Sequence, residues 1–135
     1  INVSGHRLST AEMEEMVSAH PAVAECAVIG IADALRGQRP VALVVLKNGL
    51  PINSTDLEKE LIQKVRQELG PVAYFKNAIT VKRLPKTRSG KILRKVMRQM
   101  ADGEKYTPPS TIDDPLILDE IKANMQEKQI GLAFV

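Results

Sequence analysis

Two apolar runs, VAECAVIGIAD at residues 23–33 and PVALVVLK at residues 40–47, constrain the fold of this 135-residue chain more than any other feature. Both runs are rich in β-branched residues, and both are short enough to be buried strands. Between them lies a short polar segment, DALRGQR, in which Gly37 suits a turn. The sequence therefore predicts two buried strands that follow one another through a turn.

Two amphipathic helices are predicted on either side of these runs. In LSTAEMEEMVSAHP, Ser9 and Glu12 have the spacing of a capping box, which satisfies free amides at a helix start, and Pro21 ends the helix. In NSTDLEKELIQKVRQELGP, Thr55 and Glu58 form a second pair of this kind, and an apolar stripe follows one face. The Gly-Pro pair ends that helix.

The rest of the chain adds a strand, two helices and a linker. The segment NAITVKRL alternates in the manner of a short strand, and SGKILRKVMRQMADG is an amphipathic helix for which Ser89 is a good N-cap. The proline-containing segment EKYTPPSTIDDP is predicted to be a linker. A last helix is predicted from Asp114 and Pro115 to about Lys128.

These elements make the predicted fold class α+β, with a small, mainly antiparallel sheet and flanking amphipathic helices. The length suits one domain. We expect residues 1–103 to form its core and residues 104–135 to form a linker and a helical tail. The opening INVSGH has no signal-peptide or transit-peptide character, and it is typical of the inside of a structural unit, as in an excised fragment.

Charge is segregated along the chain. Residues 69–101 hold nine Lys or Arg and no Asp or Glu, whereas the remaining 102 residues hold ten basic and sixteen acidic residues, a net charge of −6. Such a basic stretch favours a site for an anion. Nucleic acid is the competing ligand, but the chain has only four aromatic residues for stacking and no zinc-finger, homeodomain or RNP-type motif. We therefore expect no nucleic-acid partner.

Composition disfavours several other classes of protein. No run approaches the roughly 18 apolar residues needed to span a bilayer, so no membrane partner is expected. Cys26, the single cysteine, lies in an apolar run without a basic neighbour, which favours an inert core thiol and a reducing, intracellular compartment. One cysteine and two histidines show no metal-ligand spacing, so no metal site is predicted.

Two segments carry candidate functional residues. With Ser89 as N-cap, Lys91 falls in the first turn of a helix, where the helix dipole disfavours a cation unless an anion such as phosphate is bound. The alternative is a solvated lysine on a basic helix. In NVSGHRL, the alternative to a functional role is a tight hairpin that needs Gly5 and leaves Arg7 solvated. His6 is interpreted as structural, because no carboxylate or nucleophile is placed to work with it.

Four segments in one order, NVSGHRLSTAE, AVIGIAD, VRQELGP and LPKTRSGKILR, resemble the small C-terminal domain of the adenylate-forming enzymes. Together with the tail segment STIDDP, the resemblance covers nearly the whole chain and is closest to the short-chain acetyl- and propionyl-CoA synthetases. It implies a mobile lid on a large N-terminal domain that binds the carboxylate and ATP. Mg²⁺ is expected to accompany ATP in the full-length enzyme and not to be bound by the lid. One lid orientation would form acyl-adenylate and pyrophosphate, and the other would deliver CoA and release AMP. The isolated chain is expected to be inactive.

The same resemblance implies roles for individual residues. Lys91 corresponds to the lysine that contacts the carboxylate and the α-phosphate during adenylation, and it is an expected target of reversible acylation, which makes a deacylase an expected partner. Ser4 and Gly5 match residues that border the pantetheine passage of CoA. Arg7 matches an arginine near the nucleotide phosphates. Arg66 matches the arginine associated with the 3′-phosphate of CoA, with a solvated helix position as the alternative.

Several points stay open at this level. A medium-chain acyl-CoA synthetase, a peptide-synthetase adenylation domain or a luciferase-like enzyme shares the lysine, although SGHR and STIDDP fit these less well. Acetate and propionate are both open, with a lean to propionate, because the acyl pocket belongs to the large domain. The cytoplasm and the mitochondrial matrix are both open as well. No role follows for Lys86, Arg88 or the tail after Gly103.

Overall fold

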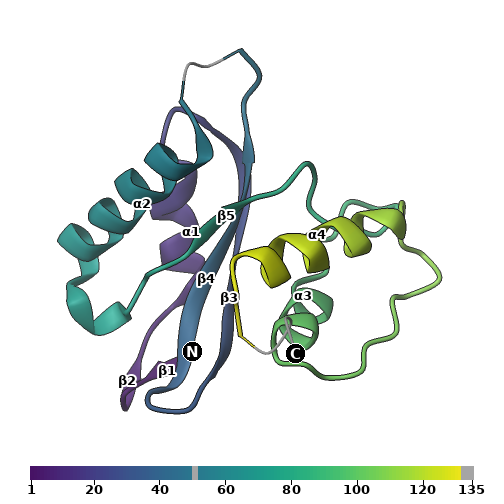
Figure 1. The fold of residues 1–135 in the computed structure, drawn as a ribbon. Coiled ribbons are helices and arrows are strands. Elements are labelled where there is room, and N and C mark those ends of the chain that lie inside the picture. The colour runs from purple at the N-terminus through teal and green to yellow at the C-terminus, as the bar shows by residue number, and fades with distance from the viewer. Residues whose placement is uncertain (50–51, 132–135) are drawn as a thin grey trace.

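The computed structural model describes residues 1–49 and 52–131, which form an α+β fold around one mixed sheet (Figure 1). The two apolar runs are its two long strands, β3 (Val23–Asp33) and β4 (Gly37–Leu46), and they pair in antiparallel register. The strand order is β2-β1-β4-β3, and β5 (Ala78–Thr80) pairs with β4 in parallel. The predicted α+β class with a mainly antiparallel sheet is therefore confirmed, with β5 as the parallel exception.

The long strands are almost continuously apolar because helices cover both faces of the sheet. Along β3, Ala27 and Ile29 belong to one buried cluster, whereas Cys26 and Val28 belong to another. This alternation follows from the two-residue period of a strand, which sends successive side chains to opposite faces. A strand buried on both sides has no solvent-facing positions to fill with polar residues.

One face of the sheet, which we call the α1/α2 face, is covered by α1 (Thr10–Ser18) and α2 (Ser54–Leu69). Each of these helices sends an apolar stripe onto the sheet, with the buried positions Met13 and Val17 in α1 and Leu57, Leu61 and Val65 in α2. Figure 1 shows both helices on the same side of the strands. Helical spacing of three and four residues between these positions places them on a single side of each helix.

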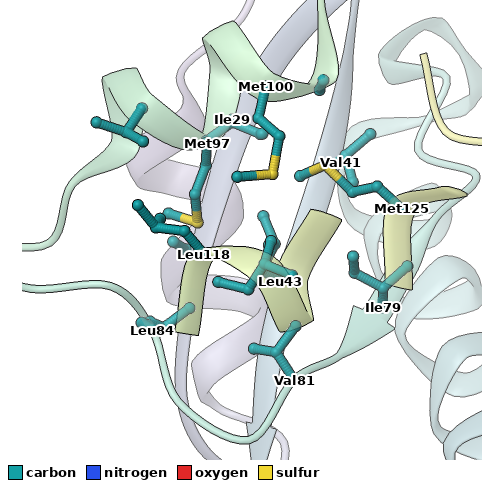
Figure 2. Close-up of a cluster of buried hydrophobic side chains, with 14 of the residues drawn as sticks. Ile29, Val41, Leu43, Ile79, Val81, Leu84, Met97, Met100, Leu118 and Met125 are labelled. Carbon is teal, nitrogen blue, oxygen red and sulfur yellow. The ribbon is translucent and has the colours of Figure 1, made fainter. Parts of the chain in front are cut away.

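The opposite face, the α3/α4 face, is covered by α3 (Arg94–Ala101) and α4 (Leu116–Glu127). Figure 2 shows the methionines of α3 and α4 lying between the helices and the strands. Fully or almost fully buried side chains fill this cluster, including Met97, Met100, Ile121 and Met125. Removing such a side chain to Ala costs about 2–5 kcal/mol, so this cluster carries a large share of the stability.

The helix starts were predicted unevenly. Ser9 caps α1 as predicted, because its Oγ accepts a hydrogen bond from the N–H of Glu12 at 3.1 Å. The prediction that Thr55 caps the second helix is wrong, since Asn53 is the N-cap and its side chain accepts from the N–H of Asp56 at 2.8 Å. Asn, Ser and Thr stand in a row here, and all three are good caps, so local preference alone does not choose among them.

Glu58, the other half of the predicted second capping box, has a different role. Its carboxylate accepts a hydrogen bond from the N–H of Ala78 at 2.9 Å and so ties α2 to the start of β5. The last helix was predicted correctly: α4 begins after Pro115, and the side chain of Asp114 accepts from the N–H of Leu116 at 3.0 Å. No helix in residues 1–49 and 52–131 is both long and apolar enough to cross a membrane.

Candidate functional site

Lys91 lies in a small β-hairpin formed by residues 85–93, which we call the lysine hairpin. Lys86 and Ile92 face each other in antiparallel pairing. On either side of this pair, the N–H of Thr87 donates to the carbonyl of Lys91 and the N–H of Leu93 donates to the carbonyl of Pro85, both at 2.9 Å. The hairpin leads directly into α3.

The turn of the lysine hairpin is closed by Thr87 and Gly90. The N–H of Gly90 donates to the carbonyl of Thr87 at 2.9 Å, and Gly90 has a φ of +93°, a conformation that favours glycine. Thr87 Oγ1 accepts a hydrogen bond from the N–H of Lys91 at 3.1 Å and lies 2.9 Å from Ser89 Oγ. The turn therefore fixes the backbone at Lys91 through a side chain four residues earlier.

This geometry corrects the prediction that Ser89 caps the third helix. The helix begins at Arg94, its N-cap position is Leu93, and no side chain caps it. Ser89 instead turns its hydroxyl toward Thr87, a local bond of the kind that competes with helix formation, and the positive φ of Gly90 is incompatible with a right-handed helix. Lys91 thus precedes the helix, and the argument from its first turn does not apply.

The side chain of Lys91 is exposed and borders an open groove of about 680 Å³. The groove runs between the start of α3 and the linker after it, and it carries basic side chains from both, among them Lys95 and Lys105. Thr107 and Pro109 complete the wall formed by the linker. A lysine on a fixed backbone beside further cations suits an anion with several charged oxygens.

Two ion pairs bracket the lysine hairpin. Lys86 Nζ lies 2.7 Å from a carboxylate oxygen of Glu25 on β3, and Arg94 Nη2 lies 2.7 Å from Glu14 on α1. The two acidic partners come from the N-terminal part of the chain, so the segregated charges of the sequence meet at this point. Sequence reasoning gave Lys86 no role, because an ion pair across 61 positions leaves no local pattern.

Ser4, Gly5 and Arg7 belong to a second hairpin, formed by β1 (Asn2–Val3) and β2 (His6–Arg7). Ser4 and Gly5 have φ values of +51° and +84°, as a two-residue type I′ turn requires. A Cβ built on Gly5 meets nothing within 4 Å, so the backbone conformation and not crowding within this chain requires glycine there. The side chains of His6 and Arg7 are exposed.

The two hairpins are attached to different strands of the sheet. The β1–β2 hairpin continues one side of β4, whereas the lysine hairpin is tied to β3 on the other side through Lys86. One pocket is lined by Ile1 and Thr10 together with Arg94 and Lys95, and neither Arg7 nor Lys91 is among its lining residues.

Arg66 is exposed on α2 and lines a shallow pocket that sequence reasoning did not foresee. The pocket also holds Ile62, Tyr74, Phe75 and Lys76. The Tyr74 ring is flanked by two cations, since the Arg36 guanidinium lies 3.4 Å and Lys76 Nζ 5.4 Å from the ring centroid. The signal that could have indicated this site is the aromatic pair directly before a lysine, in the sequence YFK after the helix end.

Lys91 and Arg66 are mounted on opposite faces of the sheet. Ile92 and Leu93, which follow Lys91, pack against the α3/α4 cluster. Val65 and Ile62, next to Arg66, pack in or against the α1/α2 cluster. The segments that carry Lys91 and Arg66 therefore pack against opposite faces of the sheet.

Among the residues that the structure describes, two titratable groups have shifted pKa values, and neither belongs to these sites. Burial raises the pKa of the Cys26 thiol to about 11, helped by the charge of Glu14, which agrees with an inert core thiol. The pKa of Asp33 is lowered, chiefly because the N–H of Arg36 donates to its carboxylate at 2.8 Å. This bond shapes the β3–β4 turn. Within residues 1–49 and 52–131, no group of three or more metal-ligating side chains comes together.

Comparison with curated proteins finds relatives along nearly the whole chain. It is 59% identical over 131 residues to an uncharacterized protein of Pseudomonas aeruginosa, covering 97% of this chain and 21% of that protein. It is 51% identical over 131 residues to the mitochondrial acyl-CoA synthetase short-chain family member B of Dictyostelium discoideum, covering 97% and 19%. It is 49% identical over 123 residues to an acetyl-coenzyme A synthetase of Penicillium chrysogenum, covering 90% and 18%. The chain thus spans about a fifth of these relatives' length.

Comparison with solved structures and family models agrees with this. The crystal structure of a Brucella canis acyl-CoA synthetase superposes with a TM-score of 0.66 at 37% identity, covering 73% of this chain and 18% of that one. Residues 12–91 match the model of the AMP-binding enzyme C-terminal domain, a span that includes both Lys91 and Arg66. The chain belongs to the AMP-binding enzyme C-terminal domain family.

Proposed function

We propose that this chain is the C-terminal lid domain of an AMP-forming short-chain acyl-CoA synthetase, which converts acetate or propionate, ATP and CoA into acyl-CoA, AMP and pyrophosphate. The observation that carries the proposal is the match to a short-chain acyl-CoA synthetase family member across 97% of the chain. In this proposal, residues 1–103 and the linker and helical tail of residues 104–135 together form the lid, since α4 of the tail packs into the α3/α4 cluster. The large N-terminal domain supplies the carboxylate site and the site for ATP with its Mg²⁺.

Lys91 acts in the first half-reaction. A carboxylate oxygen attacks the α-phosphorus of ATP, a bond forms between them, and the bond to the leaving pyrophosphate breaks. This step brings two anions together and builds charge on the phosphoryl oxygens. An ammonium group presented from the tip of a fixed hairpin reduces the repulsion and holds the reacting groups in line. The basic groove beside Lys91 supports this role.

The second half-reaction uses the β1–β2 hairpin, with Ser4, Gly5 and Arg7, and Arg66 on α2. The CoA thiol, as thiolate, attacks the acyl carbon of the adenylate, and AMP leaves with the bonding electrons. Ser4 and Gly5 border the pantetheine arm at a tight turn that offers no side chain at Gly5, and Arg7 lies near the nucleotide phosphates. Arg66 donates to the 3′-phosphate of CoA, where a guanidinium forms charge-assisted bonds.

The two-sided layout of the domain supports this division of work. Lys91 and Arg66 are mounted on opposite faces of one sheet, so a rigid rotation of the domain would present one and withdraw the other. Acylation of Lys91 would remove its charge and stop the first half-reaction, and a deacylase would restore it. Relatives in mitochondria favour an intracellular location.

The test separates the half-reactions in the full-length synthetase. We expect Lys91→Ala to lower acyl-dependent exchange between ATP and pyrophosphate by about 10²-fold or more, the effect of losing one preorganised electrostatic group. The same variant should convert supplied acyl-adenylate and CoA to thioester at the wild-type rate. Equal damage to both half-reactions would contradict the assignment.

A further inference from the structure

Residues 86–88, the first arm of the lysine hairpin, lie between the returning arm of the hairpin and a segment of the tail. They face the returning arm through the single bridge of Lys86 with Ile92. On the other side they pair with Thr111–Asp113, which we call the tail strand, with Thr87 facing Ile112. The N–H of Arg88 donates to the carbonyl of Thr111 at 2.8 Å, and the N–H of Asp113 donates to the carbonyl of Lys86 at 2.9 Å.

Two contacts fix the first arm of the lysine hairpin to the body of the domain: the tail strand and an ion pair. Ile112 is buried and belongs to the α3/α4 cluster, so the tail strand is anchored in the core. In the ion pair, Lys86 Nζ lies 2.7 Å from a carboxylate oxygen of Glu25 on β3, and both side chains are only partly exposed. The strand that precedes the Lys91 turn is therefore held by main-chain bonds from the tail and by an ion pair to β3.

The hairpin has reason to need these supports. A two-stranded hairpin is only marginally stable in water, and Lys91 itself is exposed on a long flexible side chain. Catalysis by a positioned charge is sensitive to displacement, since a shift of about 1 Å can cost as much as 10²-fold in rate. Without its supports the turn would place the ammonium group in many positions, of which few suit the reaction.

We propose that the tail strand and Lys86 are positioning elements for Lys91, holding the lysine hairpin in the geometry that adenylation requires. This inference rests on the proposed role of Lys91 and adds a function for the tail. The family model ends at residue 91, so the tail strand lies outside it. The relatives that match over 131 residues align with the tail as well.

The tail strand is tested with a matched pair of variants at one position of the full-length synthetase. Asp113→Pro removes the N–H that donates to Lys86, whereas Asp113→Ala keeps it and changes only an exposed side chain. We expect Asp113→Pro to lower kcat for adenylation about tenfold with KM for ATP within about twofold, because the lysine acts on the transition state. The conversion of supplied acyl-adenylate should stay at the wild-type rate. Asp113→Ala should behave as wild type.

The ion pair is tested by a double-mutant cycle on two partly exposed side chains, which keeps the proposal testable if Asp113→Pro does not fold. Lys86→Ala and Glu25→Ala should each lower adenylation by about 3- to 10-fold, and the double variant should be no worse than the single ones. Lys86→Arg should restore most of the rate. Lys82→Ala is the control, an exposed lysine nearby for which the described residues provide no ion pair.

The outcomes are distinguishable. Selective loss of adenylation in Asp113→Pro and Lys86→Ala supports the inference. Equal loss in both half-reactions, in step with a lower Tm, would mean that these groups only stabilise the fold, and it would overturn the inference. Unchanged adenylation in both variants would overturn it as well, while leaving the role of Lys91 intact. If Lys91→Ala itself adenylates normally, the proposed role of Lys91 is wrong, and this inference, which rests on that role, is wrong as well.

Discussion

The hydroxyl of Thr87 accepts a hydrogen bond from the backbone N–H of Lys91 at 3.1 Å. The proposed catalytic residue is thus held at its main chain, while its side chain is exposed. The same hydroxyl lies 2.9 Å from Ser89 Oγ, so one threonine organises the turn on both sides of Gly90. We therefore expect the placement of the Lys91 charge to depend on Thr87.

Thr87→Val removes this acceptor and keeps the branched shape. We expect adenylation to fall about fivefold, or about 1 kcal/mol in the activation free energy, which is the usual worth of one such bond. Thr87→Ser keeps the hydroxyl and should retain most of the activity. The measurement is ATP–pyrophosphate exchange in the full-length synthetase beside the thioester half-reaction. A Val variant with normal exchange would show that the hydroxyl does not matter for the position of Lys91.

Arg66→Ala should weaken the use of CoA and spare adenylation. A guanidinium bond to phosphate is stronger than a neutral one, but an exposed surface screens it, so we expect a loss of about 1–2 kcal/mol, or roughly 5- to 30-fold in kcat/KM for CoA. The comparison pairs this variant with dephospho-CoA, which lacks the 3′-phosphate. Wild type should lose efficiency with dephospho-CoA while the variant hardly changes. If both lose the same factor, Arg66 does not contact that phosphate.

Gly5→Ala should affect stability and the CoA step together. At a φ of +84° an L side chain is strained, and we expect a loss of about 1 kcal/mol in the free energy of unfolding. If the turn borders the pantetheine passage, the added methyl group should also slow thioester formation without slowing adenylation. Ser4→Gly is the matched control, since it relieves a positive φ and should not destabilise the fold. A Gly5→Ala variant with unchanged thioester formation would place the passage elsewhere.

Cys26 should make stability depend on alkaline pH. Its pKa is raised from an ordinary value of 9.0 to about 11 in the folded chain, so the folded state binds the proton more tightly than the unfolded state. The stabilisation is complete below pH 9 and is lost as the pH rises from 9 towards 11. Denaturant unfolding of the chain and of Cys26→Ala at several pH values isolates this effect from the titration of lysines and tyrosines. Parallel pH profiles for the two proteins would contradict it.

The strands and the helix faces were predictable because each carries a local periodic signal. The apolar runs became β3 and β4, and the buried positions of α2 fall where helical spacing puts them. The two errors, at Thr55 and Ser89, both concern where a helix begins: Asn53 caps α2, and α3 begins at Arg94 without a side-chain cap. At Ser89 the outcome depends on a competing bond to Thr87 and on the φ of Gly90, which residue preferences alone do not fix.

The parts of the site that were missed join residues far apart in the sequence. The ion pair from Lys86 to Glu25 spans 61 positions, and the stacking of Arg36 on Tyr74 joins the β3–β4 turn to the segment after α2. The pairing of Thr87 with Ile112 crosses the linker. Such contacts are set by how the layers pack and leave no period or motif that a single sequence displays. The functional assignments themselves came from resemblance, and they stay predictions.

Successive side chains of β3 point to opposite faces of the sheet, with Val28 in the cluster of the α1/α2 face and Ile29 in the cluster of the α3/α4 face. One thin layer of backbone therefore separates the surfaces proposed for the two chemical steps. In the proposed mechanism, such a domain serves one chemical step at a time, and its orientation corresponds to the stage of the catalytic cycle. We expect damage to β3 to disturb both steps at once, whereas damage to one helix layer should leave the other step working.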